Sequence, residues 1–166
     1  MSTRLVPMSI KGLMLDPVSN SPIVVLKDED EKFFLPIWVG IFEANAIALQ
    51  LESIATPRPM THDLLRDTIA RLDAHVARVV INDLRDSTFF AQIALVAGDR
   101  TLELDARPSD AIALALRTAA PIFVVQSVLD QAQTISPESA GGEEQEEKLK
   151  KWFEQLGPDD LGKYKM

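Results

Sequence analysis

The segment from residue 105 to residue 117 gathers side chains that can do chemistry. Asp105, Arg107 and Asp110 lie where a strand-like run leads into a helix that is otherwise almost wholly apolar. Carboxylates at this strand-to-helix junction can hold a divalent cation, and the planar guanidinium of Arg107 can bind a phosphate. Charged groups beside a buried element are costly to desolvate unless they pair, cap or bind something.

The same three residues also have a structural interpretation. Asp110 falls at the third position of the predicted helix, where an acid meets the helix dipole favourably and can cap backbone N–H groups. Arg107 can simply bridge the two acids. Structural ion-pair clusters imitate functional sites, so both interpretations stay open.

A second candidate group lies on a loop and at the start of the helix that follows it. His62 can act as general acid or base, and Arg58 can steady a phosphate. Asp63 begins the same helix, where an acid commonly interacts favourably with the helix dipole and needs no further role. A lone histidine on the surface usually has no function. The loop position favours function, because binding and catalytic residues concentrate on loops.

Glu43 is a third candidate carboxylate. It begins an apolar helix directly after the segment from Trp38 to Gly40, so it is either a first-turn acid or part of a site. It meets Asp105 and Asp110 only if the two strand-to-helix junctions pack next to each other. His75 has no polar cluster around it and is predicted to be a packing or surface residue.

The elements that must position these side chains follow from periodicity and turn residues. Thr61 is the predicted N-cap of the second helix, and Pro108 suits the first position of the third. The predicted strands cover residues 4–15, 23–27, 33–39, 76–84, 88–96, 101–105 and 121–126. The predicted helices cover residues 40–54, 61–72, 108–118 and 127–132.

The element order repeats along the chain. A shift of 65 residues superposes Ala46–Leu49 on Ala111–Leu114, and both halves read strand, strand, strand, helix. We interpret this as an internal duplication. The predicted fold class is α+β, with a duplicated strand-strand-strand-helix unit, a mixed or antiparallel sheet and a short C-terminal helix.

The composition limits the chemistry. The 166 residues include no cysteine, which excludes disulfides and thiolate metal sites, and two histidines, which are too few for a His-rich zinc site. The net charge of −8 argues against broad nonspecific attraction to nucleic acid. Trp38 and Trp152 both lie in apolar stretches, so no base-stacking platform is evident. No stretch reads as a signal peptide or membrane span, so we expect a cytoplasmic protein without membrane contact.

Three regions are predicted: a domain over residues 1–133, a flexible linker over 134–147, and a C-terminal amphipathic helix and tail over 148–166. Residues 148–156 carry Leu149, Trp152, Phe153 and Leu156 on one stripe. This helix and the strand edges predict a homodimer or another homo-oligomer.

Three motifs together resemble the bifunctional nuclease family. They are Leu35–Ala48, Arg58–Leu64 and Asp105–Arg117, and the resemblance covers roughly residues 4–133 in order. Members of the family are described as degrading both DNA and RNA, and the tail resembles that of the shorter bacterial members. The resemblance implies a nuclease with DNA and RNA as substrates.

The predicted function is therefore hydrolysis of phosphodiester bonds in DNA and RNA, assisted by a divalent metal, Mg²⁺ or Mn²⁺. The alternative is a non-catalytic binding or regulatory module whose charged junctions organise an oligomer interface or bind a small anion. The predicted catalytic residues are Glu43, His62, Asp63, Asp105 and Asp110, with Arg58 and Arg107 binding substrate and Asp105 and Asp110 binding the metal.

Overall fold

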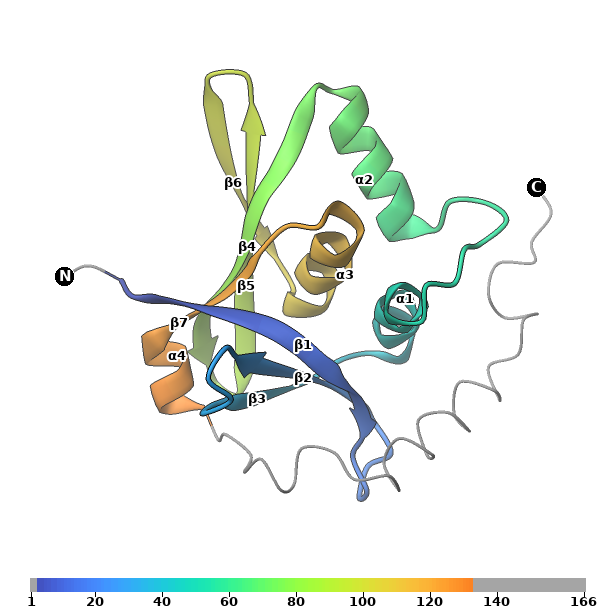
Figure 1. The fold of residues 1–166 in the computed structure, drawn as a ribbon. Coiled ribbons are helices and arrows are strands. Elements are labelled where there is room, and N and C mark those ends of the chain that lie inside the picture. The colour runs from blue at the N-terminus through green and yellow to red at the C-terminus, as the bar shows by residue number, and fades with distance from the viewer. Residues whose placement is uncertain (1–2, 133–166) are drawn as a thin grey trace.

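The structure is a computed structural model that describes residues 3–132. Its helices are α1 (Ile41–Leu51), α2 (Thr61–Arg71), α3 (Pro108–Thr118) and α4 (Gln126–Gln131). Its strands are β1 (Leu5–Leu15), β2 (Pro22–Asp28), β3 (Phe34–Trp38), β4 (Ala74–Arg85), β5 (Thr88–Ala97), β6 (Arg100–Ala106) and β7 (Ile122–Val125). Figure 1 shows α1, α2 and α3 together on one side of the sheet, while α4 lies away from them, against β4 and β7.

The seven strands form one mixed sheet in the order β3-β2-β1-β7-β4-β5-β6. The pair β4–β7 is parallel, and every other neighbouring pair is antiparallel. Two three-stranded meanders thus flank β7, and each meander is followed in sequence by a helix, α1 or α3, with α2 inserted between the halves. The α+β class and the repeated strand-strand-strand-helix order are confirmed.

Local sequence explains how the helices begin and end. Pro108 takes the first position of α3, where its missing N–H costs nothing, and Ala119 ends the helix in a left-handed conformation with φ of 54°. The predicted N-cap of α2 is wrong by one residue, because Met60 precedes the helix and Thr61 is its first residue. The backbone N–H of Met60 donates to the Asp63 carboxylate at 3.0 Å, so the acid in the first turn supplies the capping interaction.

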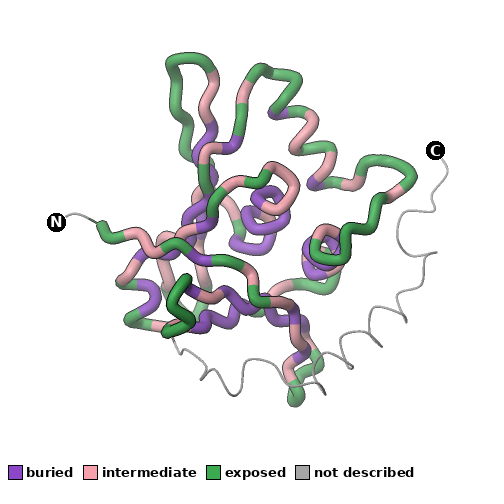
Figure 2. Tube along the Cα trace, in the orientation of Figure 1, coloured by how far each residue is buried: buried purple, intermediate pink, exposed green. Residues whose placement is uncertain are grey.

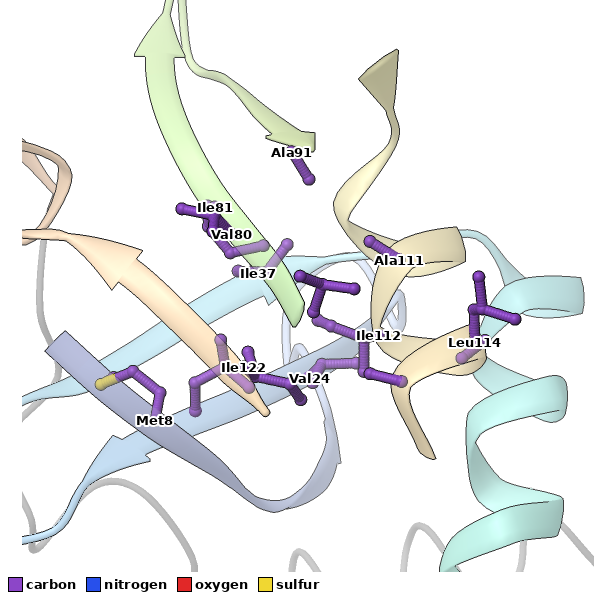
Figure 3. Packing of buried hydrophobic residues seen from close by; sticks show 14 of the residues in the cluster. Met8, Val24, Ile37, Val80, Ile81, Ala91, Ala111, Ile112, Leu114 and Ile122 are labelled. Carbon is purple, nitrogen blue, oxygen red and sulfur yellow. The ribbon is translucent and has the colours of Figure 1, made fainter. Parts of the chain in front are cut away.

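The core lies between the sheet and the helices. Ile112 and Leu114 of α3 are fully buried, as are Val24 of β2 and Ile81 of β4 (Figure 3). Figure 2 shows buried residues concentrated in α3, α1 and the adjoining strands, with exposed residues along the β5–β6 hairpin and the loop before α2. Small buried alanines from residue 111 to 115 on α3 and from 44 to 48 on α1 let these helices approach closely. The first turns of the two helices are thereby held next to each other.

The predicted helical turns over residues 127–132 correspond to α4. The predicted linker, 134–147, and the predicted amphipathic helix, 148–156, lie outside the described residues. Between residues 3 and 132, no helix has the length and apolar character needed to cross a membrane.

Candidate functional site

The first turns of α1, α2 and α3 bring four charged or titratable side chains into one connected cluster. Arg107, the N-cap residue of α3, donates from Nε to Asp110 Oδ2 at 2.8 Å and from Nη2 to Glu43 Oε1 at 2.8 Å. The second oxygen of Asp110, Oδ1, lies 2.9 Å from Nε2 of His62. We call Glu43, Arg107, Asp110 and His62 the junction cluster. It joins the two strand-to-helix junctions of the repeated units directly, through Arg107 and Glu43, and connects α2 to them through His62.

Charge and hydrogen bonding determine the ionisation of Asp110, and through it which nitrogen of His62 carries the hydrogen. Burial disfavours the charged form of Asp110, but hydrogen bonds from Arg107 and His62 outweigh it and hold the pKa of this carboxyl below its ordinary value. An ionised carboxylate only accepts hydrogen bonds, so Nε2 of His62 carries the hydrogen. Nδ1 has no hydrogen-bond partner among residues 3–132 and is the nitrogen left to exchange a proton.

Arg107 is the accessible cation of the cluster. Its side chain is 66% exposed, and hydrogen bonds to Asp110 and Glu43 raise its pKa, so the guanidinium stays charged. Nε and Nη2 are held by the two carboxylates, while Nη1 makes no hydrogen bond to any described residue. A planar guanidinium fixed on one edge and open on the other suits contact with a phosphate oxygen.

Gly40, the N-cap residue of α1, leaves the space that the Glu43 carboxylate occupies. A Cβ atom added at Gly40 would collide with Oε2 of Glu43. Because its φ is −70°, the backbone here does not itself require glycine. The absent side chain is what allows Glu43 to fold back beside its own helix start and hold Arg107.

A second, more deeply buried ion pair ties the same three helices together. The side chain of Arg117 in α3 is 1% exposed and donates from Nε to Asp63 Oδ1 of α2 at 2.8 Å. Its Nη2 also donates to the carbonyl oxygen of Ala46 in α1 at 3.0 Å. Burial opposes ionisation of Asp63, but hydrogen bonds from the Met60 backbone and from Arg117 outweigh this effect and lower the pKa of the carboxyl group. Each side-chain nitrogen of Arg117 and each carboxylate oxygen of Asp63 has a hydrogen-bond partner within the protein, so this pair has a packing role.

The structure therefore unites some predicted site residues and separates others. Glu43, His62, Arg107 and Asp110 come together, and Asp63 lies beside them in the buried ion pair. Asp105 is exposed on β6, in register with Gln92, and makes no hydrogen bond or ion pair to a described residue. Arg58 is exposed in the loop before α2.

That loop borders a pocket of about 290 Å³ between α1 and α2. Arg58 lines the pocket together with Arg66, Asp63 and the buried Arg117. Arg58 is thus close to the helix that carries His62 but is not part of the junction cluster.

His75, predicted to be a packing or surface residue, is exposed on β4.

Neither Asp105 nor Asp110 presents a ready set of ligands for a divalent cation. Both oxygens of Asp110 are engaged by Arg107 and His62, and within residues 3–132 no group of three or more His, Asp or Glu side chains is arranged to hold a metal. The chemistry that the junction cluster offers directly is proton exchange at an imidazole and binding of an anion.

Two residues near the cluster, Arg117 and Trp38, were not predicted from the sequence to lie there. Arg117 follows Asp110 by seven residues, which places both on the same face of α3, and that spacing was the available signal. Trp38 lies within an apolar run, and nothing in the run itself indicates that this side chain remains exposed.

The fold and the cluster define an α+β domain with a carboxylate-oriented histidine and an exposed arginine. Residues 24–137 match the family model of the bifunctional nuclease domain, and this range contains the whole junction cluster. The chain belongs to the bifunctional nuclease domain family.

Relatives fall into two groups. An uncharacterized protein of Mycobacterium tuberculosis is 39% identical over 159 residues, which is 92% of this chain and 95% of that protein. "Bifunctional nuclease 2" of Oryza sativa subsp. japonica is 28% identical over 140 residues, 81% of this chain and 43% of that protein. "Bifunctional nuclease 1" of Arabidopsis thaliana is 27% identical over 118 residues, 69% of this chain and 36% of that protein.

Proposed function

We propose that the protein is a nuclease that hydrolyses phosphodiester bonds in DNA and RNA, with the junction cluster as its active site. Membership of the bifunctional nuclease domain family supports the class of activity. The observation that carries the choice of site is the His62–Asp110 pair beside the exposed Arg107 guanidinium. A cytoplasmic location remains a prediction of the sequence.

In this proposal each residue of the cluster has one task. Arg107 binds a non-bridging oxygen of the phosphate, and Glu43 keeps its guanidinium in place. Nδ1 of His62 accepts a proton from the attacking water as its oxygen bonds to phosphorus. The bond from phosphorus to the leaving oxygen then breaks, that oxygen takes up a proton from water, and the imidazolium returns its proton to solvent. Asp110 orients the imidazole and stabilises its charged form.

Assistance by Mg²⁺ or Mn²⁺ is a separate part of the proposal. It rests on the general need to neutralise charge in phosphodiester hydrolysis, and no step above depends on a metal bound at Asp105 or Asp110. A metal requirement would therefore have to involve further ligands, rearrangement of the cluster or the substrate itself.

The decisive experiment incubates the purified full chain with single- and double-stranded DNA and RNA, in Mg²⁺, in Mn²⁺ and with a chelator. We expect cleavage by the wild type and a loss of about 10²- to 10⁴-fold in rate for His62→Ala. The matched control is His75→Ala, which removes an exposed histidine of β4 and should leave the rate unchanged. Absence of cleavage in every condition, or equal rates for His62→Ala and the wild type, would overturn the proposal.

A second candidate function is a non-catalytic binding or regulatory module. It is favoured by the fact that the same contacts cross-link α1, α2 and α3, with both oxygens of Asp110 already partnered. On this alternative, Asp110→Asn lowers the midpoint of thermal unfolding while the wild type shows no cleavage. If Asp110→Asn keeps the wild-type unfolding midpoint but loses cleavage, the result supports the nuclease instead.

A further inference from the structure

A pocket of about 330 Å³ adjoins the junction cluster on the side of β3. Three segments that are far apart in sequence meet there: the end of β3 with the turn into α1, the β4–β5 turn, and the first residues of α3. Arg107 lines this pocket as well as belonging to the cluster, so a ligand in the pocket lies next to the proposed phosphate-binding guanidinium.

Trp38 lines this pocket and has an exposed aromatic side chain. It is the last residue of β3 and remains 54% exposed, although the strand residues before it are buried. Its indole Nε1 donates to Asp16 Oδ2 at 3.0 Å, which fixes the edge of the ring while the remainder stays available. A large aromatic side chain that is anchored at one edge and left half in solvent is suited to stacking.

The rest of the lining completes a mixed aromatic and polar site. Phe89 at the start of β5 is half-buried and adds a second aromatic side chain, while Ser109 of α3 is buried and polar. The volume lies near the lower end of the range for small-molecule pockets, roughly 300–1,000 Å³. One flat apolar surface, one cation and a small volume together match a single nucleotide, which has a stacking base and an anionic phosphate.

We propose that this pocket binds one nucleotide of the substrate strand, with the base stacked on Trp38 and the adjoining phosphate on Arg107. This inference rests on the proposed nuclease function and adds the substrate contact that orients the scissile bond. Stacking is tolerant of base identity, because every base has an aromatic face. The pocket therefore accounts for binding of both DNA and RNA through an unpaired nucleotide.

Binding is tested with 5′-mononucleotides, and with ribose 5-phosphate as the ligand that lacks a base. The chain has two tryptophans, so the Trp152→Phe variant leaves Trp38 as the sole indole fluorophore. We expect mononucleotides to quench its emission and to bind more tightly than ribose 5-phosphate. Trp38→Ala, followed by calorimetry, should weaken mononucleotide binding about 10- to 100-fold and leave ribose 5-phosphate binding unchanged.

Two further variants make the test specific. Trp38→Phe keeps a stacking ring and should retain most of the affinity. Phe42→Ala removes an aromatic side chain that is 84% exposed but does not line the pocket, and it should have no effect. Equal binding of mononucleotide and ribose 5-phosphate, or unchanged binding by Trp38→Ala, overturns the inference.

The kinetic readout separates this inference from the proposed function. On a single-stranded oligonucleotide, Trp38→Ala should raise KM by about 10-fold or more. If the wild type cleaves nucleic acid and Trp38→Ala has the same KM, the nuclease stands and the nucleotide pocket fails. If mononucleotides quench Trp38 but nothing is cleaved, the pocket stands and the proposed nuclease fails.

Discussion

Asp110 is held at once by an arginine and a histidine, and this double contact sets its chemistry. The carboxylate accepts from Arg107 at 2.8 Å and lies 2.9 Å from Nε2 of His62. Removing its charge affects both partners, since the imidazole loses its orienting anion and the guanidinium loses one of its two carboxylate partners. Asp105, five residues earlier, is exposed and has no such contact to a described residue.

Substituting each of these two acids in turn distinguishes their roles. Asp110→Asn should lower the nuclease rate by about 10²-fold or more, because the histidine is no longer held in the reactive tautomer. Asp105→Asn should retain the wild-type rate if acid–base chemistry at His62 is sufficient. Steady-state rates in Mg²⁺ and with chelator test both variants. Equal losses for the two variants, in Mg²⁺ only, would instead support a metal bound between Asp105 and Asp110.

At the scale of secondary-structure elements, α1, α2 and α3 depend on the buried Asp63–Arg117 ion pair. Asp63→Asn should lower the free energy of unfolding by about 3–5 kcal/mol, because it leaves the buried guanidinium of Arg117 without its carboxylate. The control, Asp67→Asn, breaks an exposed pair with Arg66 and should cost less than about 1 kcal/mol. Urea unfolding at neutral pH measures both.

The same ion pair predicts a pH dependence of stability. Because the folded-state pKa of Asp63 is lowered, its contribution is fully present above the ordinary value of 3.8 and is lost as the pH falls through the lower folded value. The difference in stability between the wild type and Asp63→Asn should therefore be large at neutral pH and shrink below 3.8. A difference that stays constant down to the acid-unfolding range would contradict this assignment.

The junction between β3 and α1 gives a further prediction at this scale. Gly40→Ala places a Cβ atom against the Glu43 carboxylate, so Glu43 must move and Arg107 loses one of its holders. KM for oligonucleotides should rise several-fold, while N-cap replacement costs no more than about 1 kcal/mol of stability. Gly12→Ala is the control, because a Cβ atom there meets nothing within 4 Å. Equal KM values for the two variants would show that the Glu43 contact does not position Arg107.

At the scale of the whole molecule, the two edges of the sheet differ. The β3 edge carries Pro36, which has no N–H to donate, whereas β6 is exposed along most of its length and contains no proline. Leu102 and Leu104 of β6 are also exposed apolar residues. We propose that the predicted homo-oligomer, most simply a dimer, forms by pairing of β6 with a second copy.

Sedimentation equilibrium tests this proposal. The wild type should show at least twice the mass of one chain, and Leu102→Lys combined with Leu104→Lys should shift it to the monomer. The control, Val18→Lys, changes an apolar residue that is 94% exposed in the turn between β1 and β2, on the other half of the sheet from β6, and should leave the oligomer intact. A monomeric wild type, or a double variant that still associates, would contradict it.

Much of the element pattern follows from local sequence. The apolar periodicity, the turn clusters and Pro108 place α3 at residues 108–118 and the strands within a few residues of their observed bounds. The repeated strand-strand-strand-helix order is also visible in the chain, because each half carries its own turn and helix-start residues. Residue types at the junctions indicated that Glu43, His62, Arg107 and Asp110 were candidates for chemistry.

Only the tertiary structure decides which candidates meet. Close packing of α1 against α3 brings Glu43 to Arg107, and α2 carries His62 to Asp110, although 48 residues separate that pair in sequence. The same packing leaves Asp105 outside the cluster and Trp38 exposed beside it. The physical reason is that periodicity specifies which face of an element is buried, whereas contacts between elements depend on how those faces pack together.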